Sequence, residues 1–142
     1  MPRVVWMVLF RDGFEDLRPL QAALARYREP IREITSEHFK FGSTAELDIQ
    51  LSRGAHVLAE SGEISANFPQ GDSSAIADCN QRIELSWDGK DDPGLITNLI
   101  GFIEPEISRL VGNCWTFDCE NGVLFPAHRR PSEPKRPWWK FW

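Results

Sequence analysis

Residues 3–10 read RVVWMVLF, and every position after the first is apolar. Valine, tryptophan and phenylalanine favour the pleated surface of a sheet. A short apolar run without alternation indicates a strand that is buried on both faces, whereas a half-buried strand would alternate apolar and polar residues. The run is far too short to span a bilayer, which needs about 20 residues. We therefore predict that this segment is a central strand of a sheet.

The segment that follows carries a helical pattern. Leu17, Leu20, Leu24 and Tyr27 recur at the spacing of one helix face. Asp12 and Glu15 stand three residues apart, which is the spacing of a capping box. Pro30 then stops the pattern, since proline cannot continue a helix. We predict a helix over residues 13–28.

Alternating segments come next. Glu46–Leu51 (ELDIQL) and Arg82–Trp87 (RIELSW) alternate apolar and polar residues cleanly, as half-buried antiparallel strands do. Looser alternation predicts further strands at Ile31–Phe41, Ala55–Glu60 and Glu63–Phe68. The chain thus supplies several consecutive strands after its first helix.

A second helix has clear start and stop signals. Asp92 can cap it, with Pro93 at the first helical position and Gly112 as the stop. Pro105 lies inside the apolar stripe, and we expect it to kink the helix without ending it. Its apolar residues form one continuous stripe: Ile96, Leu99, Ile100, Ile103, Ile107 and Leu110.

The chain then offers a closing hairpin and a tail. Cys114–Phe117 and Val123–Phe125 flank an Asn-Gly pair, which is typical of a hairpin turn. The element order predicts an α+β fold, a two-layer sandwich with an antiparallel or mixed sheet and two helices on one face. A ferredoxin-like variant is the nearest arrangement. We assign residues 1–125 to one α+β domain and residues 126–142 to a Pro-rich, basic, aromatic tail.

The net charge of −5 conceals an uneven distribution over the 142 residues. Residues 126–142 hold five Lys or Arg against one Glu, a charge of +4, whereas residues 1–125 hold 11 basic and 20 acidic residues, a charge of −9. Nucleic acids need clustered Lys and Arg, so no nucleic-acid partner is expected. An acidic body suits a basic protein partner, although acidic surface also serves solubility alone.

Six carboxylates are the candidate contacts for such a partner, because they fall on strands and loops predicted to face water. They are Glu46, Asp48, Glu84, Asp88, Asp91 and Asp92. Three close carboxylate pairs also invite a test for acid–base chemistry, which needs two carboxyl groups facing one cleft. The pairs are Asp91 with Asp92, Glu104 with Glu106, and Asp118 with Glu120. Helix capping and turn formation are the favoured interpretation of these pairs.

An enzyme or ligand-binding domain is the alternative, with a pocket between sheet and helices. Its suspects are His38, His56, Asp118 and Cys119. The carboxylates beside Cys119 should raise its thiol pKa, which disfavours a nucleophile. The spacing of the three cysteines does not resemble a zinc site, and neither a Gly-x-Ser-x-Gly elbow nor a phosphate loop is present. We expect no metal, cofactor or catalytic residue.

The tail is the remaining candidate for interaction. Trp138, Trp139, Phe141 and Trp142 crowd its last five residues. Exposed aromatic patches mark interaction sites. Three interpretations stay open: the tail folds back onto the acidic body, it docks on a partner or second subunit of an assembly, or it touches a membrane interface.

Residues 82–125 also carry a family resemblance. RIELSWD, a Pro/Gly loop, an amphipathic helix and a hairpin with WTFD at residues 115–118 follow one another. This order resembles small acidic immunity proteins of bacterial toxin systems. The resemblance implies a single-domain cytoplasmic inhibitor that blocks the basic active site of a toxin acting on nucleic acid. It implies no catalytic residues, and the aromatic tail departs from it.

Overall fold

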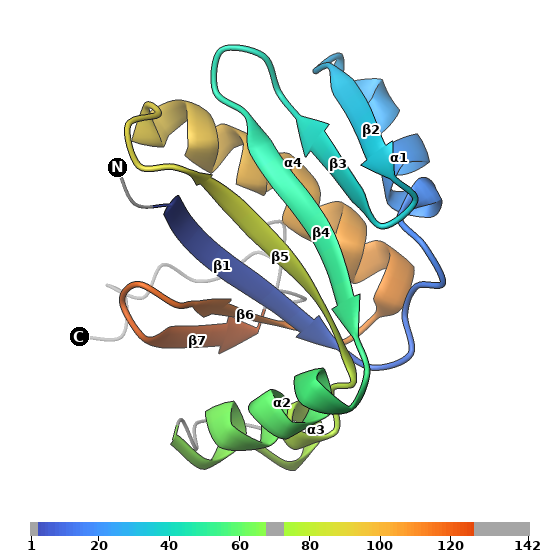
Figure 1. Cartoon of the computed structure of the whole chain (residues 1–142), viewed down its shortest axis with the longest axis vertical. Helices are drawn as coiled ribbons and strands as arrows, with labels where there is room; N and C mark the ends of the chain where they lie inside the picture. The colour runs from blue at the N-terminus through green and yellow to red at the C-terminus, as the bar shows by residue number, and fades with distance from the viewer. Residues whose placement is uncertain (1–2, 68–72, 127–142) are drawn as a thin grey trace, which may run out of the picture.

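The computed structural model describes residues 3–67 and 73–126. Their elements follow the chain in the order of Figure 1. They are β1 (Arg3–Phe10), α1 (Arg18–Leu24) with a 3₁₀ turn (Ala25–Tyr27), β2 (Ile31–Thr35), β3 (His38–Phe41), β4 (Leu47–Arg53), α2 (Ala55–Asn67), α3 (Ser73–Ala77), β5 (Gln81–Asp88), α4 (Pro93–Val111), β6 (Trp115–Asp118) and β7 (Val123–Pro126).

One seven-stranded antiparallel sheet organises the fold, in the order β2-β3-β4-β5-β1-β6-β7. β1 pairs with β5 on one side and with β6 on the other, so the prediction of a central strand is confirmed. The strands β4-β5-β1-β6, with α1 following β1 and α4 following β5, have the order of a ferredoxin-like plait. The β2–β3 hairpin and β7 extend that plait at its two edges.

The main core lies between the sheet and the helices α1 and α4. Val8 and Phe10 of β1 point into it together with Leu20 of α1 and Ile103 of α4, and all four side chains are completely buried. Figure 1 shows α4 crossing behind β5 and β4. Two helices on one face is thus the observed arrangement, as the sequence predicts.

The opposite face of the sheet is covered only in part. Leu9 and Trp115 pack there with Ile64 of α2 and with Ile76 and Cys79 around α3. Figure 1 shows α2 and α3 gathered at the end of the sheet where β1 finishes. This short third layer was not expected. It buries Leu9 completely, so β1 is enclosed on both faces only toward its C-terminal end.

The helix α2 corrects two predictions. Ala55–Glu60 and Glu63–Phe68 were expected to be strands, but residues 55–67 form one helix. Its buried positions are Val57, Ser61, Ile64 and Ser65, which follow helical and not alternating spacing. Small side chains at two of these four positions weakened the apolar signal of the helix. The pair Ser61-Gly62 suggested a turn, yet a helix interior tolerates glycine at a cost of only about 0.5–1 kcal/mol.

The start of α1 corrects a third prediction. Asp12 has a positive φ of 48° and lies well before the helix, so the capping box with Glu15 is not formed. The helix starts at Arg18, whose backbone N–H donates to Asp16 Oδ1 at 2.9 Å. Residues 11–17 form a loop instead, whose backbone N–H groups donate to the side chains of Asn80 and Gln81. The long strand expected over residues 31–41 is likewise a hairpin of β2 and β3.

The helix α4 matches its predicted signals. Asp92 Oδ1 accepts a hydrogen bond from the Gly94 backbone N–H at 2.8 Å, and the helix ends at Gly112, where φ is +83°. The helix runs through Pro105 without interruption. Neither α4 nor another helix within residues 3–67 and 73–126 combines the length and apolarity that crossing a bilayer requires.

Candidate functional site: an acidic groove beside α4

A groove of about 540 Å³ lies on the helix face of the sheet, between α4 and the ends of β1, β5 and β6. It forms because α4 crosses over β4 and β5 and leaves this part of the same face open. We call it the acidic groove. Its lining residues are Val4, Trp6, Trp87, Gly89, Asp91, Pro93, Ile96, Thr97, Ile100, Gly101, Glu104, Asp118, Glu120 and Asn121.

The floor of the acidic groove is apolar and aromatic. Trp6 of β1 and Trp87 of β5 meet edge to face, with ring centroids 6.1 Å apart and an interplanar angle of 64°. Ile96 and Ile100 of α4 continue the apolar surface. Such a surface contacts aromatic rings and the flat face of a guanidinium well.

The rim of the groove is acidic. Asp91, Glu104, Asp118 and Glu120 are among the lining residues, and no Lys, Arg or His is found in the lining described above. Each of these four belongs to one of the carboxylate pairs noted in the sequence. Asp118 and Glu120 of one pair both line the groove, whereas Asp92 and Glu106 of the other two pairs do not, so the surface is assembled from the β5–α4 loop, α4 and the β6–β7 hairpin.

Two of these carboxylates are fixed by hydrogen bonds. Asp118 is only 6% exposed. Its Oδ1 accepts the backbone N–H of Glu120 at 3.0 Å and of Asn121 at 3.2 Å, while its Oδ2 accepts the Asn121 amide at 2.8 Å. Glu104 Oε2 accepts the hydroxyl of the buried Thr116 at 2.6 Å. Asp118 therefore organises the hairpin turn, as predicted from its turn chemistry.

Three of the six predicted partner contacts belong to this region. Asp91 lines the groove, Asp92 stands beside it in the β5–α4 loop, and Asp88 is the last residue of β5; neither Asp88 nor Asp92 is among the lining residues. Asp88 Oδ1 accepts the Lys90 backbone N–H at 2.8 Å, and Asp92 caps α4. Of the three, only Asp91 contributes to the groove, while Asp88 and Asp92 stabilise the local backbone.

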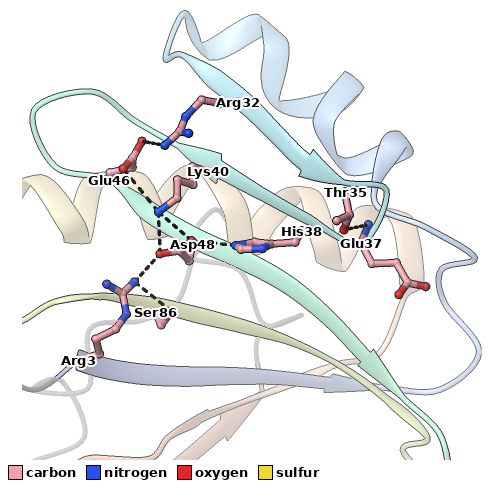
Figure 2. Close-up of polar contacts among 9 residues, drawn as sticks. All are labelled: Arg3, Arg32, Thr35, Glu37, His38, Lys40, Glu46, Asp48 and Ser86. Carbon is pink, nitrogen blue, oxygen red and sulfur yellow. Dashed lines mark hydrogen bonds and ion pairs between the residues drawn. The ribbon is translucent and has the colours of Figure 1, made fainter.

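The other three predicted contacts lie away from the groove, and Asp48 is the clearest case. Its side chain is 14% exposed and lies on the side of the sheet opposite α4 (Figure 2). His38 Nε2 lies 2.8 Å from Asp48 Oδ1, Lys40 Nζ lies 3.2 Å from the same oxygen, and Arg3 donates to Oδ2 at 2.5 Å. Burial acts to raise the pKa of Asp48, but the bonds to His38 and Lys40 outweigh it and lower that pKa.

Glu46 and Glu84 are also paired within the chain. Glu46 lies 3.8 Å from Arg32 and 3.9 Å from Lys40, measured between charged atoms (Figure 2). Glu84 Oε2 accepts from Arg82 Nε at 2.9 Å and from the Ser52 hydroxyl at 3.3 Å. The open face of β3, β4 and β5 therefore carries balanced charge. The sequence alone does not reveal these ion pairs, because the register of the strands decides which side chains face one another across the sheet.

The four suspects of the enzyme alternative are not gathered in one pocket. His38 is on the open sheet face beside Asp48, and His56 is on α2, not on the strand that was expected there. Only Asp118 of the four lines the acidic groove. Cys119 is exposed in the β6–β7 turn.

The cysteines have raised thiol pKa values. Burial, together with the nearby Cys114 and Asp78, raises the pKa of Cys79 to about 12. Although Cys119 as a residue is exposed, partial burial of its thiol is the largest cause that raises its pKa, with Asp118 and Glu84 adding to it against the lowering effect of Arg82. The predicted direction for Cys119 is confirmed. Both thiols are protonated at neutral pH, which makes them poor nucleophiles.

Two further expectations concern ligands and the tail. Among residues 3–67 and 73–126, no three His, Cys, Asp or Glu side chains are grouped closely enough to hold a metal ion. Trp138, Trp139, Phe141 and Trp142 lie outside the described residues, as do all positions after Pro126. Their predicted interaction role stays a prediction.

Comparisons with protein-family models, with curated proteins and with solved structures find no match to this chain. The site itself is a groove with two tryptophans in its floor and four carboxylates, and its described lining holds no basic residue.

Proposed function

We propose that this protein is a non-enzymatic inhibitor of the immunity type, which binds a basic protein partner through the acidic groove. The observation that carries the proposal is the lining of the groove, where four carboxylates surround an aromatic floor without a basic residue among the lining side chains described. Complementary charge accelerates encounter with a basic partner and disfavours acidic ones. The surplus negative charge of residues 1–125 acts in the same direction.

The groove suits a partner better than the open sheet face does. Glu46, Asp48 and Glu84 are already bound to cations of this chain, so a partner would have to displace those pairs. The groove instead offers an arginine two kinds of contact at once. Its guanidinium would lie on Trp6 or Trp87 and would donate to a rim carboxylate. Aromatic and arginine contacts of this kind dominate binding energy at protein interfaces.

The first test is complex formation with the product of the neighbouring gene, measured by titration calorimetry. We expect a complex that weakens as salt rises, since the attraction is ionic. The double variant Asp91→Asn with Glu120→Gln should bind at least about tenfold more weakly, which is about 1.4 kcal/mol. Cells that express a toxic partner should be protected by the unchanged protein and less well by the variant.

The matched control is Glu63→Gln, which removes one exposed carboxylate from α2, away from the groove. It should leave the affinity within about twofold. Equal weakening by the control and the groove variant would contradict a specific role of the groove. Failure to bind a basic product of an adjacent gene, or to protect cells from it, would reject the immunity function.

A small-molecule binding domain is the second candidate, favoured by the size of the groove. Ligand pockets occupy about 300–1,000 Å³ and combine apolar walls with a few polar groups. The acidic groove falls within that range. A cationic, aromatic small molecule would be the matching ligand. Saturable quenching of tryptophan fluorescence by such a compound, absent in the groove variant, would favour this function over partner inhibition.

A further inference from the structure

We propose that the basic, aromatic residues 127–142 of this same chain bind in the acidic groove and compete there with external ligands. The proposal uses the same groove as the proposed function, but it does not require that any partner exists. It names an occupant that the chain itself supplies. The sequence of this segment, the charge of the groove and the position of Pro126 carry the inference.

The groove provides complementary charge. Its lining holds Asp91, Glu104, Asp118 and Glu120. The segment 127–142 holds five Lys or Arg and a single Glu, so its formal charge is +4 against four carboxylates in the groove. Opposite charges of this number attract across several ångströms even in salt, because the Debye length is about 8 Å at physiological ionic strength.

The groove also provides an apolar surface for aromatic rings. Trp138, Trp139, Phe141 and Trp142 alternate closely with Lys140 at the end of the segment. Each large ring that leaves water removes about 150–250 Å² of surface from contact with it. The floor formed by Trp6, Trp87 and the isoleucines of α4 is the apolar surface that adjoins the rim carboxylates.

The chain is long enough to reach the groove. β7 leaves the hairpin at Val123, which pairs with the groove residue Asp118, and ends at Pro126, opposite Trp115. Four strand residues span about 13 Å. The 16 residues after Pro126 could extend over about 50 Å. The segment can therefore turn back, cover that distance and still place its last residues along the groove.

Binding within one chain has a measurable consequence. A short tether keeps the segment at an effective concentration of the order of 1 mM near the groove. An external basic ligand would then meet an open groove in only a fraction of molecules, which reduces its apparent affinity by that fraction. The groove would thus respond only to partners that bind more strongly than its own chain.

The test is zero-length carbodiimide cross-linking of the full-length chain in the absence of any partner, read by peptide mass spectrometry. The reagent activates a carboxylate, a lysine amine attacks it, and an amide forms as the reagent leaves as a urea. We expect monomers in which Lys135 or Lys140 is joined to Asp91, Glu104 or Glu120. These links should exceed links to the exposed Glu63 of α2 by at least tenfold.

The control keeps both lysines and removes other charges of the segment, as Arg129→Gln with Arg130→Gln and Arg136→Gln. Links to the groove should fall at least fivefold in this variant. Equal links to Glu63 and to the groove would overturn the proposal, as would links found only in dimers, which would indicate a second copy as the occupant. Each of these results is independent of whether the groove binds a toxin.

Discussion

At the scale of single residues, Gln81 shows how one side chain holds a loop where the sequence predicted the start of a helix. Its amide Oε1 accepts the backbone N–H of Gly13 at 2.7 Å and of Phe14 at 2.9 Å, and its Nε2 donates to the Phe14 carbonyl at 2.7 Å. The side chain is nearly buried. It satisfies polar backbone groups of the loop between β1 and α1 that water cannot reach fully.

We expect Gln81→Leu to lower the free energy of unfolding by about 2–3 kcal/mol, because it strands buried donors and an acceptor. Urea denaturation at constant pH measures this change. The control Gln50→Leu, at an exposed position of β4, should alter stability by less than about 0.5 kcal/mol. Equal losses of unfolding free energy in both variants would show that the hydrogen bonds of Gln81 to the loop make no specific contribution to stability.

Asp48 predicts a pH dependence. Although burial opposes ionisation, the bonds to His38 and Lys40 lower its folded-state pKa below the ordinary value of 3.8. A lowered carboxylate pKa contributes stability above the unfolded pKa, and that contribution disappears as pH falls through the folded pKa. Asp48→Asn should therefore cost about 1–2 kcal/mol at pH 7. The same substitution should cost much less at pH 2–3, as measured by urea titrations at both values.

At the scale of elements, the sequence predicted the fold where signals were redundant. Three patterns are each compatible with a single type of element: the continuous apolar run of β1, the alternation of β4 and β5, and the capped apolar stripe of α4. Ala55–Asn67 was misassigned because its buried face includes two serines, so neither periodicity dominated. The sequence could not predict the groove as one site. Glu104 and Glu120 line the same groove only because β6 pairs with β1, and this pairing is not visible in the sequence.

The glycine within α2 offers a test of that reassignment. A Cβ added at Gly62 would meet no atom within 4 Å, and the position lies in the middle of the helix. Gly62→Ala should therefore raise the free energy of unfolding by about 0.5–1 kcal/mol. Gly54→Ala should instead destabilise, because φ is +118° there. Thermal unfolding of both variants checks the prediction, and a loss in Gly62→Ala would argue against the helix.

At the scale of the whole molecule, the two faces of the sheet have different roles. One face is closed by α1 and α4 except along the acidic groove, whereas the other is covered by α2 and α3 at one end and elsewhere displays paired charges. This asymmetric coverage leaves four carboxylates around one groove, whose described lining includes no basic residue. This placement is the observation on which the proposed interaction with a basic partner rests.

The position of β1 has a consequence for synthesis on the ribosome. β1 is translated before both strands that pair with it. Its first partner is β5, where Gln81 pairs with Phe10, and its second is β6, where Trp115 pairs with Leu9. Translation proceeds at about 5–20 residues per second. The segment RVVWMVLF, which is uncharged after Arg3, therefore stays unpaired and prone to aggregation for several seconds. Chaperone engagement of nascent chains should therefore be greatest before residue 81 emerges. Ribosome profiling of chaperone-bound chains would detect that window and its closure once β5 is available.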